Sequence, residues 1–544
     1  MQKILFKVVP PRTKNVSIVA PGFVLEQDNW NDYSFQTLYQ LSFHAAILNG
    51  TIEETHIGAV KILRRGQTKL DGLLIVTDFE SLDDRFCSVG TSLDYYERLR
   101  ELGEIGQLAM AALRDVIASP EFVDNFKNEQ GWATSLFRDQ IDHGERFRVL
   151  AGGLVSGHYA KAPVDQQSFT FKMSGWLSPV VIDTTSGEQS GFQLNCLPER
   201  VNVLIGRNGS GKSTLLARLA RVAYGSPSER AEAPLKHLGT LEPNGVGFPR
   251  VVTVAFSPFD SFKLPGSDDR NRVQISKDMQ RGVGRFSFLG LRDFVAEFGQ
   301  ANQIPSPPKL GVVEVDDRVA QTRLKSIEQL NDEFAQYRQK ISEKGRQSLL
   351  MEALSNLERG LFGDDWATIV LSGSDDNARA WFHRCSTGHK ITLLVVFGLV
   401  ANLEPHSLVL VDEPETHLHP PLLSAMMHAL RRILKEFNAS AVVVTHSLVV
   451  VQESMARHVH VVRREGELTV VVPVSTETFG ESIGLITAQV FGMESNATDF
   501  HEVLDRVIAR YKRIEDIELL FKDGVMSQQA RAYVLSRLAN SAKE

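Results

Sequence analysis

An α/β fold is predicted for the centre of this 544-residue chain, and three observations predict it. Apolar runs rich in β-branched residues alternate with helix-like segments over residues 166–264 and again over 366–490, as in a parallel sheet covered by helices. A glycine-rich turn joins one such run, VNVLI, to the helix-like STLLARLARVA. The segment between the two halves, 265–365, is charged and mostly helical in pattern, so we expect a helical insertion there.

Two further regions flank this core. Residues 1–165 open with strand-like runs such as IGAVKIL and continue with helical spacing over Asp94–Ala118, which predicts an α+β N-terminal domain. Residues 491–544 are amphipathic and predict a short helical C-terminal region. Within the core, Arg323–Gly360 is expected to form one or two helices, and Ile391–Leu403 a buried helix.

The composition excludes several classes of protein. Hydrophobic residues make up 43% and charged residues 23%, as in ordinary soluble proteins, and no run approaches the roughly 18 apolar residues of a membrane-spanning helix. The three cysteines are far apart and odd in number, which argues against a disulfide framework and fits a reducing, cytoplasmic setting. With a net charge of −7, the chain would bind nucleic acid only through a local basic patch.

A phosphate-binding loop is predicted at residues 206–213, GRNGSGKS, which match the pattern G-x-x-x-x-G-K-[ST]. The loop follows a buried strand and opens a helix, so backbone N–H groups and the positive helix end face an anion. Lys212 is expected to reach the β- and γ-phosphates of ATP, and the Ser213 hydroxyl to bind Mg²⁺. The residues expected to bind the nucleotide in this loop are Gly206, Asn208, Gly209, Ser210, Gly211, Lys212, Ser213 and Thr214.

A second strand, SLVLV, ends in the acidic stretch DEPETHLHP (Asp412–Pro420). Asp412 stands where this strand leaves the core, and we expect it to hold the Mg²⁺ through water. Glu413 follows it and is expected to polarise the attacking water. Because simple nucleotide switches can do without a second acid, the Asp-Glu pair favours hydrolysis over binding alone.

Two histidines, His417 and His419, follow these acids, and their role stays open. Alternate residues share a face only on a strand, and Pro414 and Pro420 interrupt this segment, so a loop is favoured over a metal site. In a loop they would touch a neighbouring subunit or the nucleotide, or simply lie at the surface. At the end of a third buried run, SAVVVTHSLVVV, His446 is expected to face the γ-phosphate, because ligands gather at the carboxyl ends of parallel strands.

The order of these motifs resembles that of the ABC-type ATPases of the structural-maintenance and RecF group. In that family a short signature such as L-S-G-G-Q precedes the acidic strand and contacts the γ-phosphate held by the opposite subunit. Residues 385–390, CSTGHK, occupy that place here. The resemblance therefore assigns Ser386 and Gly388 to the nucleotide site of a partner copy, while Thr387 and His389 depart from the pattern.

Two details of the family pattern are less clear in this chain. A second signature candidate, Leu371–Ser374, follows the strand-like WATIVL and runs into a polar turn, so we favour Ser386 and Gly388. The family also has a glutamine after the strand that follows the phosphate loop. Here that strand ends in SPFD, and Asp260 stands nearest to the glutamine's place.

The resemblance narrows to the ATPase subunit of Septu-type antiphage defence systems, PtuA, in its retron-associated form. It rests on DEPETHLHP, AFSPFDSF and ETFGESIG, and on WNDYSFQTLYQLSF and IGAVKIL near the start of the chain. It implies an ATP-hydrolysing subunit that forms head-to-tail nucleotide dimers or larger homo-oligomers and controls a separate HNH nuclease, PtuB. In retrons it also implies a reverse transcriptase and its retron DNA-RNA product as partners, and it implies no membrane partner. No intrinsic nuclease is expected, because only about 50 residues follow Phe491 and they contain no Asp-x-Asp.

Two other functions stay open. A scaffold that binds ATP without turnover is one, with Glu413 against it and the altered signature in its favour. A RecF- or SMC-like DNA-repair ATPase is the other, and it would hold duplex DNA through basic surfaces. Candidates for those surfaces are Lys61, Arg64 and Arg65 near the start of the chain, and Arg270, Arg272, Lys277, Arg281 and Arg285 in the insertion.

Overall fold

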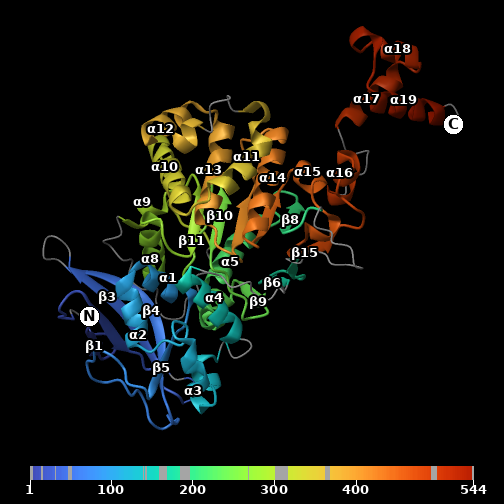
Figure 1. Ribbon diagram of the computed structural model, residues 1–544. Helices are drawn as coiled ribbons and strands as arrows, with labels where there is room; N and C mark the ends of the chain where they lie inside the picture. Colours follow the sequence, from blue (N-terminus) through green and yellow to red (C-terminus); the bar gives the residue numbers. More distant parts are fainter. Residues whose placement is uncertain are drawn as a thin grey trace.

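The computed structural model arranges the chain as a mixed α/β molecule with a large central sheet (Figure 1). The residues described are 4–541 apart from 14–15, 31, 33, 47–51, 139, 141–143, 158–167, 184–196, 268, 300–316, 362–367 and 492–498. Within them the strands form a five-stranded, a seven-stranded and a three-stranded sheet. The predicted fold class is confirmed: a P-loop α/β domain lies between an N-terminal sheet region and a C-terminal helical region.

The seven-stranded sheet has the order β11-β10-β12-β13-β8-β14-β15. All neighbouring pairs in it are parallel except β14 and β15, so the carboxyl ends of six strands meet along one edge. The strands are β8 (Val201–Gly206), β10 (Val251–Ala255), β11 (Phe286–Gly290), β12 (Leu408–Asp412), β13 (Ser440–Thr445), β14 (Val459–Glu465) and β15 (Leu468–Pro473). In doubly wound sheets this edge is where ligands bind.

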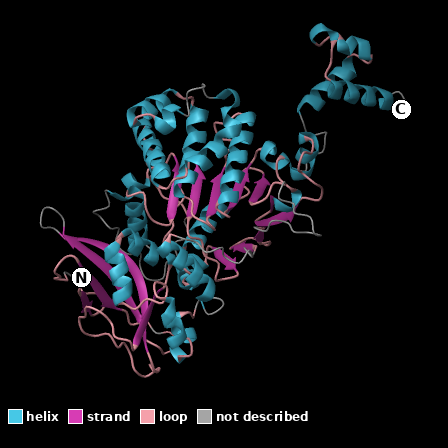
Figure 2. Cartoon of the chain, in the orientation of Figure 1, coloured by secondary structure: helices cyan, strands magenta, loops and turns pink. Residues whose placement is uncertain are grey.

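Helices cover both faces of this sheet, as Figure 2 shows. Successive side chains of a strand point to opposite faces, so Val409 and Val411 of β12 enter one core while Leu408 and Leu410 enter the other. The first face packs against α10 (Ile327–Glu343), α11 (Gln347–Leu361), α12 (Asp375–Arg384), α13 (Thr387–Asn402), α14 (Pro420–Glu436) and α15 (Leu448–Gln452). The second packs against α5 (Lys212–Tyr224), α7 (Ala233–Lys236), α8 (Asp269–Gln280), α9 (Phe294–Gly299) and the three-stranded sheet β7 (Val180–Ile182), β6 (Phe169–Met173) and β9 (Gly239–Glu242).

The N-terminal region has its own sheet and core. Its strands are β1 (Phe6–Val9), β2 (Gly22–Gln27), β3 (Leu38–Ala46), β4 (Ile52–Arg64) and β5 (Phe86–Gly90), paired in that order. The core that this sheet shares with its helices is apolar and aromatic. The helices of the region are α1 (Leu93–Glu101), α2 (Glu104–Ala112), α3 (Val123–Phe126) and α4 (Glu145–Ser156).

Helix α1 joins this region to the domain of the central sheet through buried ion pairs. Its Asp94 carboxylate lies 2.6 Å from the guanidinium of Arg285, and Arg98 lies 3.3 Å from Asp278 on α8. Glu97, which is fully buried, pairs with Arg250 at the start of β10. Separating the partners of a buried ion pair would leave each charge uncompensated, which is strongly destabilising. These pairs therefore hold α1 against the β10–β11 end of the sheet.

The C-terminal region consists of α16 (Ile483–Phe491), α17 (Asp499–Arg510), α18 (Ile514–Glu518) and α19 (Gln528–Ser541). The last three helices stand apart from the central sheet in Figure 1 and share a small core of their own. That core contains Leu504, Ile508, Ile517, Met526 and Val534. No helix in the described ranges combines the length and the apolar character needed to cross a bilayer.

Three local features add to or differ from what the sequence pattern suggests. Besides α8, α9, α10 and α11, the described part of 265–365 contains the strand β11, which pairs with β10 and forms an edge of the central sheet. Residues 300–316 lie outside the described residues. The helix expected over 94–118 breaks at Gly103, whose φ of +58° separates α1 from α2. The part of WATIVL that the structure describes forms a π-helical turn, Thr368–Ser372, and not a strand.

Candidate functional site

The phosphate loop connects β8 to α5 at the carboxyl edge of the central sheet. The backbone shape of this loop requires glycine at three positions. A Cβ atom on Gly206 would lie 2.2 Å from the carbonyl oxygen of Val462 on the adjacent β14. Gly209 and Gly211 have φ values of +77° and +90°, a region that side-chain-bearing residues rarely adopt. The loop therefore keeps a tight turn with backbone N–H groups at the start of α5.

Lys212 is buried at the base of this loop, with only 4% of its surface exposed. Its ammonium donates hydrogen bonds of 3.0 Å to the carbonyl oxygens of Gly206 and Arg207. Burial lowers the pKa of Lys212, and the nearby carboxylates of Glu413 and Asp412 act in the opposite direction. This positive charge thus lies inside the loop, where a phosphate group would meet it.

The other loop residues differ in burial and in hydrogen bonding. The Ser210 hydroxyl is buried and has no hydrogen-bond partner in the described part of the chain, so it is a donor that a phosphate oxygen would satisfy. Asn208 and Gly209 are exposed at the tip of the loop, while Thr214 is half-buried in the first turn of α5. Trp176, from the turn after β6, packs against Gly211.

Asp412 and Ser213 meet at this edge although 199 positions separate them in sequence. The Ser213 hydroxyl donates to Oδ1 of Asp412 over 2.9 Å. Burial raises the pKa of Asp412 to about 7; the Ser213 hydrogen bond lowers it, and the charges of Glu413 and Asp260 raise it further. A hydroxyl and a carboxylate are hard oxygen donors of the kind that Mg²⁺ prefers, and here they would hold the ion directly or through water. The donor set therefore fits the magnesium that the sequence predicts.

Glu413 and His446 face each other beside the loop. His446 Nε2 lies 3.3 Å from Oε1 of Glu413. Glu413 has a φ of +47°, a strained value for a residue with a side chain, and its own N–H donates to the carbonyl of Val444. Burial lowers the pKa of His446, and the nearby Lys212 lowers it further, so the ring is neutral near pH 7. A carboxylate and a neutral imidazole are thus held together next to Lys212.

Glu415 is a site residue that the sequence analysis did not assign. Its carboxylate accepts hydrogen bonds from the backbone N–H of His446, over 2.6 Å, and from the hydroxyl of Thr445, over 2.8 Å. It also contributes to the charge around Lys212. The signal in the sequence was the third acid of DEPE, but no motif says that it reaches the end of β13.

Asp260 lies close enough to Asp412 for its charge to raise the pKa of that carboxyl. It follows β10, which pairs with β12 so that Ala255 lies opposite Asp412. Its own carboxylate accepts the N–H of Phe262 over 3.0 Å, and burial raises its pKa. Asp260 is therefore at the edge of the same acidic cluster.

Ser386 and Gly388 belong to a second group at the start of α13. Ser386 caps this helix, and its hydroxyl accepts the N–H of His389 over 3.4 Å. A Cβ atom on Gly388 would lie 3.2 Å from the carbonyl of His417 and 3.1 Å from Leu422. Gly388 thus packs against the segment that follows the acidic strand, while Ser386 caps the helix that carries it.

His417 and His419 lie in that same segment, between β12 and α14. His419 caps α14, and its Nδ1 accepts the N–H of Leu422 over 3.4 Å, while His417 has a left-handed backbone with φ of +68°. His419 lies near His389 and helps to lower its pKa, after burial. Across the described ranges, no group of three or more His, Cys, Asp or Glu residues is arranged to hold a metal ion.

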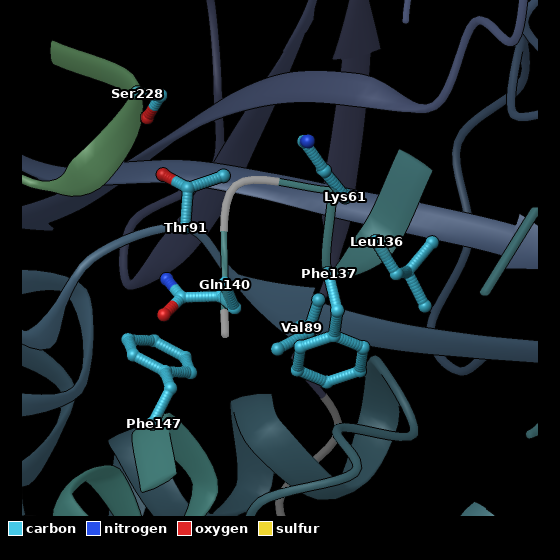
Figure 3. Close-up of a pocket in the computed structure, with 9 residues that line it drawn as sticks. Lys61, Val89, Thr91, Leu136, Phe137, Gln140, Phe147 and Ser228 are labelled. Atoms are coloured by element: carbon cyan, nitrogen blue, oxygen red, sulfur yellow. The ribbon is translucent and has the colours of Figure 1, made fainter. Parts of the chain in front are cut away.

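A small cavity of about 20 Å³ lies between the N-terminal region and α6 (Pro227–Ala231). Figure 3 shows Lys61, Gln140 and Phe147 around it, with Ser228 approaching from the ATPase domain. Its volume is enough for about one water molecule. It is lined by none of the phosphate-loop residues, so it is separate from the nucleotide site.

This chain is similar to a family model and to several known proteins. The family model for AAA domains of the AbiEii toxin type, from type IV toxin–antitoxin systems, matches residues 201–452. Among solved structures, cbiO1 of Clostridium perfringens, part of an ABC transporter complex, is 13% identical with a TM-score of 0.27 over 64% of this chain and 98% of its own. The SmcHead bound to the C-winged helix domain of ScpA is 12% identical with a TM-score of 0.25 over 56% of this chain and 96% of its own. These two TM-scores are too low to support an argument.

A full-length relative is more informative. Protein Ea59 of Escherichia phage lambda is 31% identical over 531 residues, which make up 95% of this chain and 94% of that protein. The phosphate loop, the acidic strand and His446 all lie within the matched AAA domain. The chain therefore contains an AAA-type ATPase domain and belongs to the family of the phage lambda protein Ea59.

Proposed function

We propose that this protein binds and hydrolyses ATP in a Mg²⁺-dependent reaction, at a site formed by residues 206–214, Asp412, Glu413 and His446. The observation that carries the proposal is the 2.9 Å hydrogen bond between Ser213, in the first turn of α5, and Asp412, at the end of β12. Both side chains offer oxygen atoms that can bind a metal ion. Lys212 lies near Asp412 and Glu413, and His446 is 3.3 Å from Glu413. Few functions other than nucleotide hydrolysis need these groups together.

Each group has a distinct task in the proposed reaction. The backbone N–H groups of the loop, the Ser210 hydroxyl and Lys212 bind and orient the phosphates. Ser213 and Asp412 would hold Mg²⁺, which neutralises phosphate charge when bound. Glu413 orients the attacking water and takes its proton, and His446 fixes the Glu413 carboxylate near the γ-phosphate.

We further propose that a second copy completes the site. Ser386 and Gly388 point to this, because they lie at the start of α13, where backbone N–H groups are available to an anion. Gly388 packs on the segment after the acidic strand. In a head-to-tail dimer, each copy would offer them to the γ-phosphate bound by the other. Gel filtration with light scattering, with ATP and without it, tests this on the Glu413→Gln variant.

The setting that we propose is antiphage defence, with this chain as the ATPase of a complex that controls a separate HNH nuclease. Three lines support it: the resemblance to the Septu ATPase PtuA, the AbiEii-type family match and the relative in phage lambda. In a retron system the complex would also contain a reverse transcriptase and its DNA-RNA product. We propose a cytoplasmic location and no membrane partner.

Two measurements test the proposal. Phosphate release by the purified chain should require ATP and Mg²⁺ and should stop when EDTA is added; a well-folded chain that binds no ATP would overturn the site. Affinity purification from the native operon should recover an HNH protein. Recovery of duplex DNA alone, with ATPase stimulated by that DNA, would instead support a repair function.

The duplex-binding alternative has little support from the basic residues that it would use. Lys61 and Arg285 are buried in ion pairs with Asp32 and Asp94, and their charges are unavailable to phosphates. Arg272 pairs with Asp269 and Arg281 with Glu53. The Arg270 side chain lies outside the described residues. A repair ATPase therefore remains the second candidate.

A further inference from the structure

We infer that Glu415 is a positioning residue for the proposed reaction: its carboxylate fixes the turn that carries His446, and through it the contact between His446 and Glu413. The inference rests on the proposed function, and it adds a residue that neither the motif pattern nor the comparisons assign. Glu415 lies at the carboxyl edge of the sheet, two positions after Glu413, on the segment between β12 and α14.

The carboxylate holds both groups at the end of β13 at once. One oxygen accepts the backbone N–H of His446 over 2.6 Å, and the other accepts the Thr445 hydroxyl over 2.8 Å. The Thr445 hydroxyl oxygen in turn accepts the N–H of Ser447 over 2.8 Å. The Glu415 side chain, on the segment that follows β12, therefore holds Thr445 and His446 directly, and Ser447 through the Thr445 hydroxyl. Hydrogen bonds to an ionised acceptor are shorter and stronger than neutral ones, which suits this role.

The segment that presents Glu415 is itself tightly held. The N–H of Glu413 donates to the carbonyl of Val444 over 2.8 Å, which fixes the segment to β13 at its start. Within it, the N–H of Thr416 donates to the Glu413 carbonyl and the N–H of Leu418 to the Glu415 carbonyl, each over 3.0 Å. Left-handed residues stand on both sides of Glu415, at Glu413 and His417. Strained backbone of this kind persists only where surrounding contacts determine it.

The consequence concerns the turnover step and not ATP binding. Without the Glu415 carboxylate, the His446 N–H and the fully buried Thr445 hydroxyl lose their acceptor, and the turn must rearrange to find another. The His446 ring would then leave Oε1 of Glu413, from which it is now 3.3 Å away. Lys212 and Ser213 have their own hydrogen bonds, to loop carbonyls and to Asp412, so the phosphate-binding part would persist.

A double-mutant cycle tests the inference on the full chain. We expect Glu415→Ala to lower kcat about 30- to 100-fold with KM for ATP changed less than 3-fold. Glu415→Gln keeps an acceptor for the His446 N–H. It should therefore recover at least one third of the decrease in log kcat that Glu415→Ala causes. Because Glu415 acts through His446, the Glu415→Ala/His446→Ala double variant should be no more than about 3-fold slower than His446→Ala alone.

Asp71→Ala serves as the matched control. The Asp71 carboxylate also accepts one backbone N–H and one threonine hydroxyl, both from Thr68, but it lies in the N-terminal region. Its kcat should equal that of the wild type. Loss of kcat in this variant comparable to that in Glu415→Ala would show a general effect of removing a capping acid, and would overturn the inference.

A readout that needs no activity separates this inference from the proposed function. Hydrogen–deuterium exchange in peptides covering 440–452 should be at least 10-fold faster in Glu415→Ala than in the wild type, while peptides covering 206–214 stay unchanged. Unchanged exchange at 440–452, fully additive losses of kcat in the cycle, or a rise in KM with kcat preserved would each overturn the positioning role. If His446→Ala leaves kcat intact, the proposed role of His446 fails, and with it the path by which Glu415 acts. A wild type without ATPase activity overturns the proposed function, whereas faster exchange would still establish that Glu415 holds the turn.

Discussion

Replacing Lys212 by alanine should abolish ATP binding, and the structure allows the size of the effect to be worked out. The Lys212 ammonium is the cation in a cluster with the carboxylates of Asp412, Glu413 and Glu415. Two opposite charges about 4 Å apart attract each other by about 4 kcal/mol at an effective dielectric constant of 20. Loss of this attraction for a phosphate corresponds to roughly a 1000-fold weaker affinity. The remaining carboxylates would repel the phosphates and add to the loss.

Isothermal titration calorimetry with ATP and Mg²⁺ measures this affinity directly. The variant should stay folded, because alanine removes only the donor of two hydrogen bonds, to the loop carbonyls of Gly206 and Arg207, and thermal unfolding checks that it does. Lys236→Ala, in an exposed position on α7, is the matched control and should bind ATP as the wild type does. A folded Lys212→Ala variant that binds ATP within 3-fold of the wild type would refute the site assignment.

Three further predictions test other parts of the structure. Glu413→Gln should lower kcat by about 10²- to 10⁴-fold in a phosphate-release assay while ATP affinity is kept, since an amide cannot take the proton of the attacking water. Gly206→Ala should weaken ATP binding without unfolding the chain, because its Cβ would lie 2.2 Å from the carbonyl of Val462 and displace the loop; calorimetry at wild-type affinity would contradict this. Burial raises the pKa of Asp115 from 3.8 to about 7. Between these pH values the folded state keeps a proton that the unfolded state loses. The free energy of unfolding should therefore fall by roughly 4 kcal/mol between about pH 4 and pH 7. Asp115→Asn should remove this fall, so chemical denaturation should find it more stable than the wild type at pH 8 and similar at pH 4.

The parts of the site that could be predicted from sequence are those encoded locally. The phosphate loop is a contiguous strand–turn–helix, and Asp412 directly ends a strand whose four apolar residues could only be buried. Parallel strands then bring these ends to one edge of the sheet without further information. The buried helix α13 was predicted for the same reason, because a continuous stretch of sequence encodes it. Its 12 consecutive residues Ile391–Asn402 are all buried.

The parts that could not be predicted depend on contacts between distant segments. The five residues of β11 become a strand because β10 offers a free edge, and nothing in FSFLG alone decides this. The run LVVV after His446 is rich in β-branched residues, yet it forms α15, because the chain turns at Thr445–Ser447 and packs its valines under the helices. Likewise, the charge of Arg285 is cancelled by Asp94, which lies 191 positions earlier.

The segment from Asp412 to Leu422 explains how one short motif can serve two sites. Its first residues contact Ser213 and His446, and its middle residue, Glu415, fixes the turn after β13. Its last residues, the His417 carbonyl and Leu422, pack against Gly388 at the start of α13. Hydrogen bonds and left-handed backbone hold this segment in one shape. A shift of α13 must therefore move the other end of the segment, at Asp412 and Glu413, or break those contacts. If Ser386 and Gly388 contact a nucleotide on a second copy, then each chain senses its partner's ATP at one end of the segment and hydrolyses its own at the other. The physical link between the two sites would be the seven residues, 413–419, that connect the acidic strand to α14.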